Sequence, residues 1–180
     1  MEYSEVSNIT IEMYNPDWRD AFERECDSLK GGISDSSLVL HHIGSTAVSG
    51  IYAKPIIDIL GVVEDFDKLD SQKAQFERIG YEVMGAFGIE ARRYYRKITA
   101  DGVRTHHLHI FLQGSEHIDR HLAFRDYLRL HPAVAKEYSD LKLKLLDKKD
   151  LSWDSYIDGK ESFVQRTEEK ALDWYLATKC

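Results

Sequence analysis

The spacing of hydrophobic residues changes along the chain: strand-like patterns are confined to its first part, and its last part has helical spacing throughout. Up to about residue 115, segments in which apolar residues occur in short runs or alternate with polar ones, as in strands, are separated by two stretches of helical spacing. From Glu116 onward apolar residues recur every three or four positions, as on amphipathic helices. The pattern predicts one α+β domain over residues 1–180, with a mixed sheet flanked by helices over about 1–115 and a helical cap over about 116–180.

The sheet-bearing part contains five segments with the pattern of strands. The last two are joined by Asp101-Gly102, a dipeptide typical of hairpin turns. The segment from 56 to 63 is almost continuously apolar, as expected for a strand buried on both faces. The predicted strands are 8–13, 37–42, 56–63, 92–99 and 104–112.

Helix signals lie between and after these strands. Asn15 followed by Pro16 is typical of a helix start, and Gly31-Gly32 ends that helical pattern. A crossover helix is expected between 66 and 80. In the cap, helices are expected over 118–130, from Pro132 onward, and around 157–174.

Composition narrows the functional classes. The chain has 180 residues and a net charge of −7, which disfavours a broad nucleic-acid surface because such binding depends on neutralising phosphates. A small anionic ligand remains compatible, since a local basic patch can bind it. No apolar run reaches the ~20 residues of a membrane span, and the two cysteines, Cys26 and Cys180, lie far apart. We expect a cytoplasmic protein with no membrane partner, and a homodimer stays open.

Asp58 is an acid inside an otherwise apolar predicted strand. A carboxylate there is costly unless it is paired or bound to a metal. An ion pair with Lys54 or an arginine would be a purely structural explanation, whereas a divalent cation or a catalytic base would be a functional one. Gly44, Ser45 and Thr46 end the preceding strand, where glycine permits close approach of a ligand and a hydroxyl can hold phosphate oxygens. A phosphate cradle beside a metal-binding acid is what phosphoryl transfer requires.

The segment around Asp58 also resembles a known family. Residues 42–60, HIGSTAVSGIYAKPIIDIL, are similar to the signature of the GrpB family. The resemblance continues through 14–18, 107–109 and 124–129, and to Tyr156 and Lys160. It implies the nucleotidyltransferase-like (DNA polymerase beta-like) fold and a nucleotide site.

The chain departs from these patterns at two places. Ser49 stands where the family is expected to have proline, a change that affects loop rigidity. Nucleotidyltransferases usually carry two acids at alternate positions of this strand, but Ile56 and Leu60 flank Asp58 on its face. One carboxylate supports one metal ion at most, so the sequence argues against the usual two-metal reaction.

Histidines offer further metal ligands. Strand alternation over 104–112 places His107 and His109 on one face and the more apolar set beginning with His106 on the other. Two imidazoles and Asp58 would form a site suited to Zn, Fe, Mn or Ni rather than Mg. Phosphate binding, acid–base catalysis, and hydrogen bonding within the sheet are the alternatives for the two histidines.

Basic residues complete the predicted site. Arg125 and Arg129 share one helical stripe, where a salt-bridge network is as well supported as an anion site. Lys160 lies on the apolar stripe of its helix, an unusual place for a surface lysine. The predicted nucleotide- or phosphate-binding residues are Gly44, Ser45, Thr46, Lys54, Arg93, Arg125, Arg129 and Lys160. Lys136, Lys142, Lys144, Lys148 and Lys149 are expected on a solvated helix surface.

These features together predict a protein that binds a nucleotide or phosphate, with divergent metal-dependent nucleotidyl transfer as an activity the site allows. Asp58, Ser45 and Lys54 are the predicted catalytic residues, and Asp58, His107 and His109 the predicted metal ligands. The cofactors would be a divalent cation, Mg or Mn or a Zn-like ion, and a nucleoside triphosphate. Two alternatives stay open: a non-catalytic anion-binding module that lacks the second acid, and a metal-dependent phosphoesterase.

Overall fold

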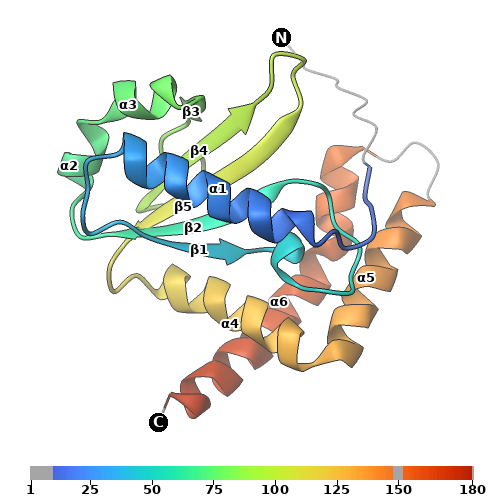
Figure 1. The fold of residues 1–180 in the computed structure, drawn as a ribbon. Helices are drawn as coiled ribbons and strands as arrows, with labels where there is room; N and C mark the ends of the chain where they lie inside the picture. The colour runs from blue at the N-terminus through green and yellow to red at the C-terminus, as the bar shows by residue number, and fades with distance from the viewer. Residues whose placement is uncertain (1–9, 148–151, 180) are drawn as a thin grey trace.

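The computed structural model describes residues 10–147 and 152–179, and its centre is a five-stranded sheet of order β1-β2-β5-β4-β3 (Figure 1). The central pair β2–β5 is parallel, and the three other pairs are antiparallel. The mixed sheet predicted from the sequence is therefore confirmed. The strands are β1 Val39–Ile43, β2 Ile57–Val63, β3 Tyr81–Val83, β4 Arg92–Ile98 and β5 Arg104–Leu112.

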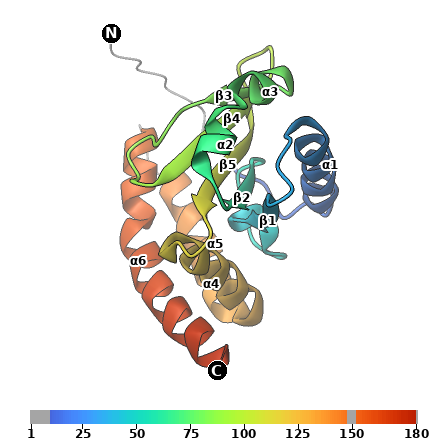
Figure 2. The same cartoon turned by 90° about the vertical axis from the view of Figure 1, so that its left-hand side faces the viewer.

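Helices cover both faces of the sheet, with α1 on one side and α4 and α6 on the other (Figure 2). Ser115 caps α4, since its hydroxyl accepts a hydrogen bond from the backbone N–H of His117. Proline begins α5 at Pro132, as expected. The helices are α1 Asp17–Gly32, α2 Phe66–Asp70, α3 Lys73–Arg78, α4 Glu116–Leu130, α5 Pro132–Leu146 and α6 Trp153–Thr178, with a short 3-10 helix, η1, at Ser45–Ala47.

The alternation of β2 divides its side chains between two cores. Ile57 and Ile59 belong to the large core shared with α1, whereas Leu60 packs with Phe111 and Leu122 on the α4 side. Asp58 therefore faces the helical cap. A third apolar cluster joins α5 and α6 to the segment that follows η1.

Several predicted elements differ in detail. Within the described part of the 8–13 segment there is only an isolated bridge between Glu12 and Ala53, and residues 8 and 9 lie outside it. The expected crossover helix is two short helices, α2 and α3, and the three-residue strand β3 had no sequence signal. No helix in the two described ranges is long and apolar enough to cross a bilayer.

Candidate functional site

The backbone at Gly44 passes directly over Asp58. Ile43 at the end of β1 is the pairing partner of Asp58, so the chain leaving β1 turns across that carboxylate. Gly44 has a φ of 72°, and a Cβ atom there would lie 2.5 Å from Oδ2 of Asp58. Only glycine satisfies both constraints, which explains the Gly-Ser turn at this place.

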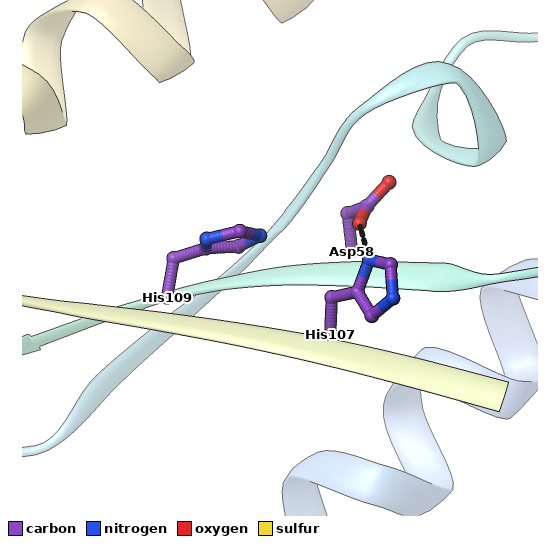
Figure 3. A group of neighbouring side chains, drawn as sticks. All are labelled: Asp58, His107 and His109. Carbon is purple, nitrogen blue, oxygen red and sulfur yellow. Dashed lines mark hydrogen bonds and ion pairs between the residues drawn. The ribbon is translucent and has the colours of Figure 1, made fainter. Parts of the chain in front are cut away.

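Asp58, His107 and His109 lie side by side across the central parallel pair (Figure 3). In the register of β2 and β5, Asp58 is opposite His107, and Leu60 is opposite His109. Nδ1 of His107 is 3.1 Å from Oδ1 of Asp58. One donor atom from each of the three residues lies within 4.8 Å of the others. The predicted trio is thus brought together by strand register.

The electrostatics of Asp58 and His109 suit a bound cation. Burial acts to raise the pKa of Asp58, but the His107 hydrogen bond and the neighbouring histidines outweigh it and lower that pKa. Burial lowers the pKa of His109 to about 4, so its imidazole is neutral at pH 7. Nε2 of His107 is buried without a hydrogen-bond partner. One carboxylate oxygen and two imidazole nitrogens fit a transition-metal ion, whereas a pair of Mg ions would need further carboxylates.

A cavity of about 270 Å³ opens beside Asp58 and His107. The sheet and η1 form one wall, and α5 and α6 form the other. Three lysines reach it: Lys54 from the segment before β2, Lys142 from α5 and Lys160 from α6. Gly44, Ser45, Thr46, Ile56, Phe124, Tyr138, Tyr156 and Ile157 complete the lining.

The expectation that Lys142 belongs to a solvated surface is wrong. Lys142 is only 2% exposed. Its Nζ donates a hydrogen bond to the carbonyl of Tyr52 and lies 3.1 Å from Ser45 Oγ. Helix α5 packs against the loop from Ser45 to Tyr52, and the backbone N–H of Tyr52 also donates a hydrogen bond to Ser139 Oγ. The sequence does carry one sign of this burial, because helical spacing places Lys142 on the same apolar stripe as Tyr138 and Leu145. Lys136 and Lys144 are exposed as expected, and Lys148 and Lys149 lie outside the described residues.

The three lysines have low proton affinity. Burial lowers the pKa of Lys54 to about 7, with repulsion from Lys160 adding to the effect and Asp58 opposing it. Burial, and then Lys160, lowers the pKa of Lys142 to about 7. Burial also lowers the pKa of Lys160 to about 8, against the attraction of Asp58. Nζ of Lys54 and Nζ of Lys160 lie 4.5 and 4.3 Å from the ring centroid of Tyr156.

The predicted arginines do not line this cavity. Arg125 donates to the carbonyl of His42, at 3.1 Å, and pairs with Asp126. Arg129 donates to the carbonyl of Ala47, at 2.8 Å. Both guanidinium groups therefore hold the backbone on either side of the Gly-Ser turn.

Arg93 is not brought to the site. It lies on the opposite face of β4 from Tyr94, whose ring contacts His107 and His109. The Arg93 guanidinium instead pairs with Asp70, at 2.7 Å, above the ring of Phe66. Strand alternation sends this side chain away from the cavity.

The mixed sheet, with a Gly-Ser turn passing over an acid of the central strand, defines a protein of the nucleotidyltransferase-like fold. Cid1 poly(U) polymerase, in a structure with Mg 3'-dATP bound, matches with a TM-score of 0.52 and 13% identity. The match covers 75% of this chain and 42% of that one, and it supports the fold alone.

The chain belongs to the GrpB family, since the family model described as GrpB protein matches residues 8–170. The UPF0157 protein YqkA of Bacillus subtilis (strain 168) is 40% identical over 166 residues, which are 92% of this chain but 48% of YqkA. The chain thus spans about half the length of that relative. The crystal structure of conserved protein GrpB from Enterococcus faecalis matches with a TM-score of 0.86 and 44% identity, covering 93% of this chain and 99% of that one. The resemblance inferred from residues 42–60 is confirmed.

Proposed function

We propose that the cavity binds a phosphorylated small molecule, a nucleotide in the first place, together with a divalent cation at Asp58. The observation that carries this proposal is the convergence of Lys54, Lys142 and Lys160 on the cavity that also contains Asp58. Lys160 lowers the pKa of Lys54 and of Lys142, and an anion placed among the three amines would stabilise their charged forms. Asp58, the acid in that lining, is already engaged with His107.

The size of the cavity supports phosphates as the part of the ligand that enters it. At about 270 Å³, it lies just below the ~300–1,000 Å³ typical of small-molecule pockets. The phosphate groups of a nucleotide would occupy it, and the base and sugar would extend outside. Lysines bind phosphate as compact charges, and the hydroxyl of Ser45 would add a hydrogen bond.

The cation would be held by Asp58 with His107 and His109. When bound there, it would neutralise phosphate charge and polarise a phosphoryl oxygen. The chain's own residues would orient the ligand: the lysines of α5 and α6 on one side, and the Gly44–Thr46 turn on the other. Nucleotidyl transfer is the reaction that the nucleotidyltransferase-like fold favours for such a complex.

Calorimetry with ATP, GTP, CTP and UTP, each with Mg or Mn, tests the proposal. We expect wild-type protein to bind at least one nucleotide, and Lys160→Met to weaken binding at least tenfold. Asp58→Asn should remove the dependence of binding on the cation. Lys144→Met, an exposed lysine on α5, is the matched control and should bind as wild type. No binding in any combination, or wild-type affinity in both Asp58→Asn and Lys160→Met, would refute the proposal.

A metal-dependent phosphoesterase is a second candidate, favoured by the donor set of Asp58, His107 and His109. It predicts a transition metal in the purified protein and hydrolysis of para-nitrophenyl phosphate by protein loaded with Zn or Mn. Elemental analysis that finds no metal, with no hydrolysis after loading, would contradict it. Nucleotide binding without turnover would instead favour the non-catalytic alternative.

A further inference from the structure

Lys142 is a buried amine without an acidic partner in the part of the chain that the structure describes. Among the described residues, no carboxylate oxygen lies within 4.0 Å of its Nζ. Its hydrogen-bond partners among these residues are Ser45 Oγ and the carbonyl oxygen of Tyr52. Burial of a charged ammonium without an acid partner is costly, so this environment favours the neutral amine.

The two oxygens fix the orientation of the neutral amine. A carbonyl only accepts hydrogen bonds, so an N–H of Lys142 must point to Tyr52. The nitrogen lone pair is then available to Ser45 Oγ, 3.1 Å away, and the serine hydroxyl donates to it. A hydroxyl within about 2.6–3.2 Å of a neutral base is the arrangement of an activated nucleophile.

Ser45 is also placed where a substrate can reach it. It lines the cavity and is half-buried, at the first position of η1. Tyr138, one turn before Lys142 on α5, lines the same cavity. The serine thus lies at the cavity wall, beside Lys142 of α5.

We infer that Ser45 is a nucleophile and that Lys142 is its general base, in a serine–lysine pair that forms a covalent phosphoserine. This inference rests on the proposed function in so far as the cavity binds a phosphoryl group. Oγ of Ser45 attacks phosphorus, and an Oγ–P bond forms while the bond from phosphorus to the leaving oxygen breaks. The leaving oxygen keeps that electron pair, and the serine proton passes to Nζ of Lys142, which becomes an ammonium beside the new phosphate.

Other charged groups around Lys142 agree with this role. Lys160 on α6 faces it and lowers its pKa. On its own helix, the ring of Tyr138 lies 4.4 Å from Nζ, and burial raises the pKa of that phenol to about 12, so it stays neutral. Neither group competes with Lys142 for the serine proton near neutral pH.

Covalent labelling with a fluorophosphonate probe tests the pair independently of any nucleotide. The serine oxygen displaces fluoride from phosphorus, and the adduct is located by intact mass and peptide mapping. We expect labelling at Ser45 in wild type, none at that position in Ser45→Ala, and a rate about 100-fold lower in Lys142→Met, the scale of a general base. Ser49→Ala removes an exposed serine four residues away and should label as wild type.

The pH dependence of labelling separates catalysis from packing. The wild-type rate should rise as pH passes about 7 and then level off, because only neutral Lys142 accepts the proton. Lys142→Met should show no inflection there, and Lys142→Gln provides a second variant should methionine prevent folding. Absence of label in wild type, label at another residue only, or wild-type rates in both Lys142 variants would overturn the inference. If nucleotides bind but Ser45 is not labelled, the serine–lysine pair is refuted and the proposed function stands. If Ser45 is labelled but no nucleotide binds, the proposed ligand is refuted and the serine–lysine pair stands.

Discussion

The two walls of the cavity differ in how their side chains are positioned and in the charge of the ligand that each can bind. On the sheet wall, Asp58 and His107 line the cavity from two paired strands, and His109 follows His107 on the same face of β5. On the helical wall, Lys142 and Lys160 come from two helices whose relative position depends on side-chain packing. The sheet wall therefore has a geometry fixed by backbone hydrogen bonds and suited to a cation. The helical wall presents positive charge to an anion.

A complex of a cation with an anionic ligand would contact both walls at once. Gly44 lies where the walls meet, since its neighbour Ser45 contacts Lys142 and its own backbone lies against Asp58. Substitutions in each wall should therefore have separable effects on binding.

Gly44→Ala should have the largest effect, because it disturbs both walls. Its methyl group would lie 2.5 Å from Asp58 Oδ2, in a backbone of positive φ. We expect loss of both nucleotide and metal binding in calorimetry, and a fall in the free energy of unfolding in denaturant titrations. Gly50→Ala is the matched control, since Gly50 has a φ of 81° and nothing within 4 Å of an added Cβ. It should cost only the ~1–2 kcal/mol of the left-handed conformation and keep binding intact. Equal losses in the two variants would contradict the role assigned to Asp58.

His109→Ala should affect the sheet wall alone. Loss of one donor from the set of three should weaken Co²⁺ binding at least tenfold, measured by its visible absorption, which also reports the ligand geometry. His106→Ala is the control, because alternation places His106 on the other face of β5, near Glu25. Its binding should match wild type. Equal weakening by both variants would show that the ion binds elsewhere.

The sheet wall could be predicted from the sequence, and the helical wall only in part. Alternation along 104–112 and the isolated acid at position 58 were enough to place Asp58, His107 and His109 together. Strand periodicity assigns a face unambiguously, and the neighbours in the sheet follow from the fold. Lys160 stands out in the sequence because it lies on a clear apolar stripe. Lys142 lies among other lysines, and its burial depends on the packing of α5 against the 45–52 loop.

Lys142 should also leave a signature in the pH dependence of stability. Its pKa falls from 10.5 to about 7 on folding, so between these values the unfolded chain binds a proton that the folded protein does not. The free energy of unfolding therefore gains a term that rises with pH, by up to about 1.4 kcal/mol per pH unit. Denaturant titrations between pH 8 and 10 should show a slope smaller by about this amount in Lys142→Met. Lys144→Met, exposed on the same helix, should keep the wild-type slope, and parallel curves for all three proteins would contradict the buried neutral amine.

Arginine substitutions should have the smallest effects and define where the site ends. Arg93→Ala removes a partly exposed pair with Asp70 on the far face of the sheet, worth about 0–1 kcal/mol of stability. It should leave nucleotide affinity unchanged in calorimetry, although sequence alone placed Arg93 among the phosphate contacts. Arg129→Ala removes the hydrogen bond to the carbonyl of Ala47 and should weaken binding severalfold, because the turn that presents Ser45 loses a support. A large loss of affinity in Arg93→Ala would mean that the anion site extends beyond these two walls. No loss in Arg129→Ala would mean that the turn is held by its contacts with Asp58 and α5 alone.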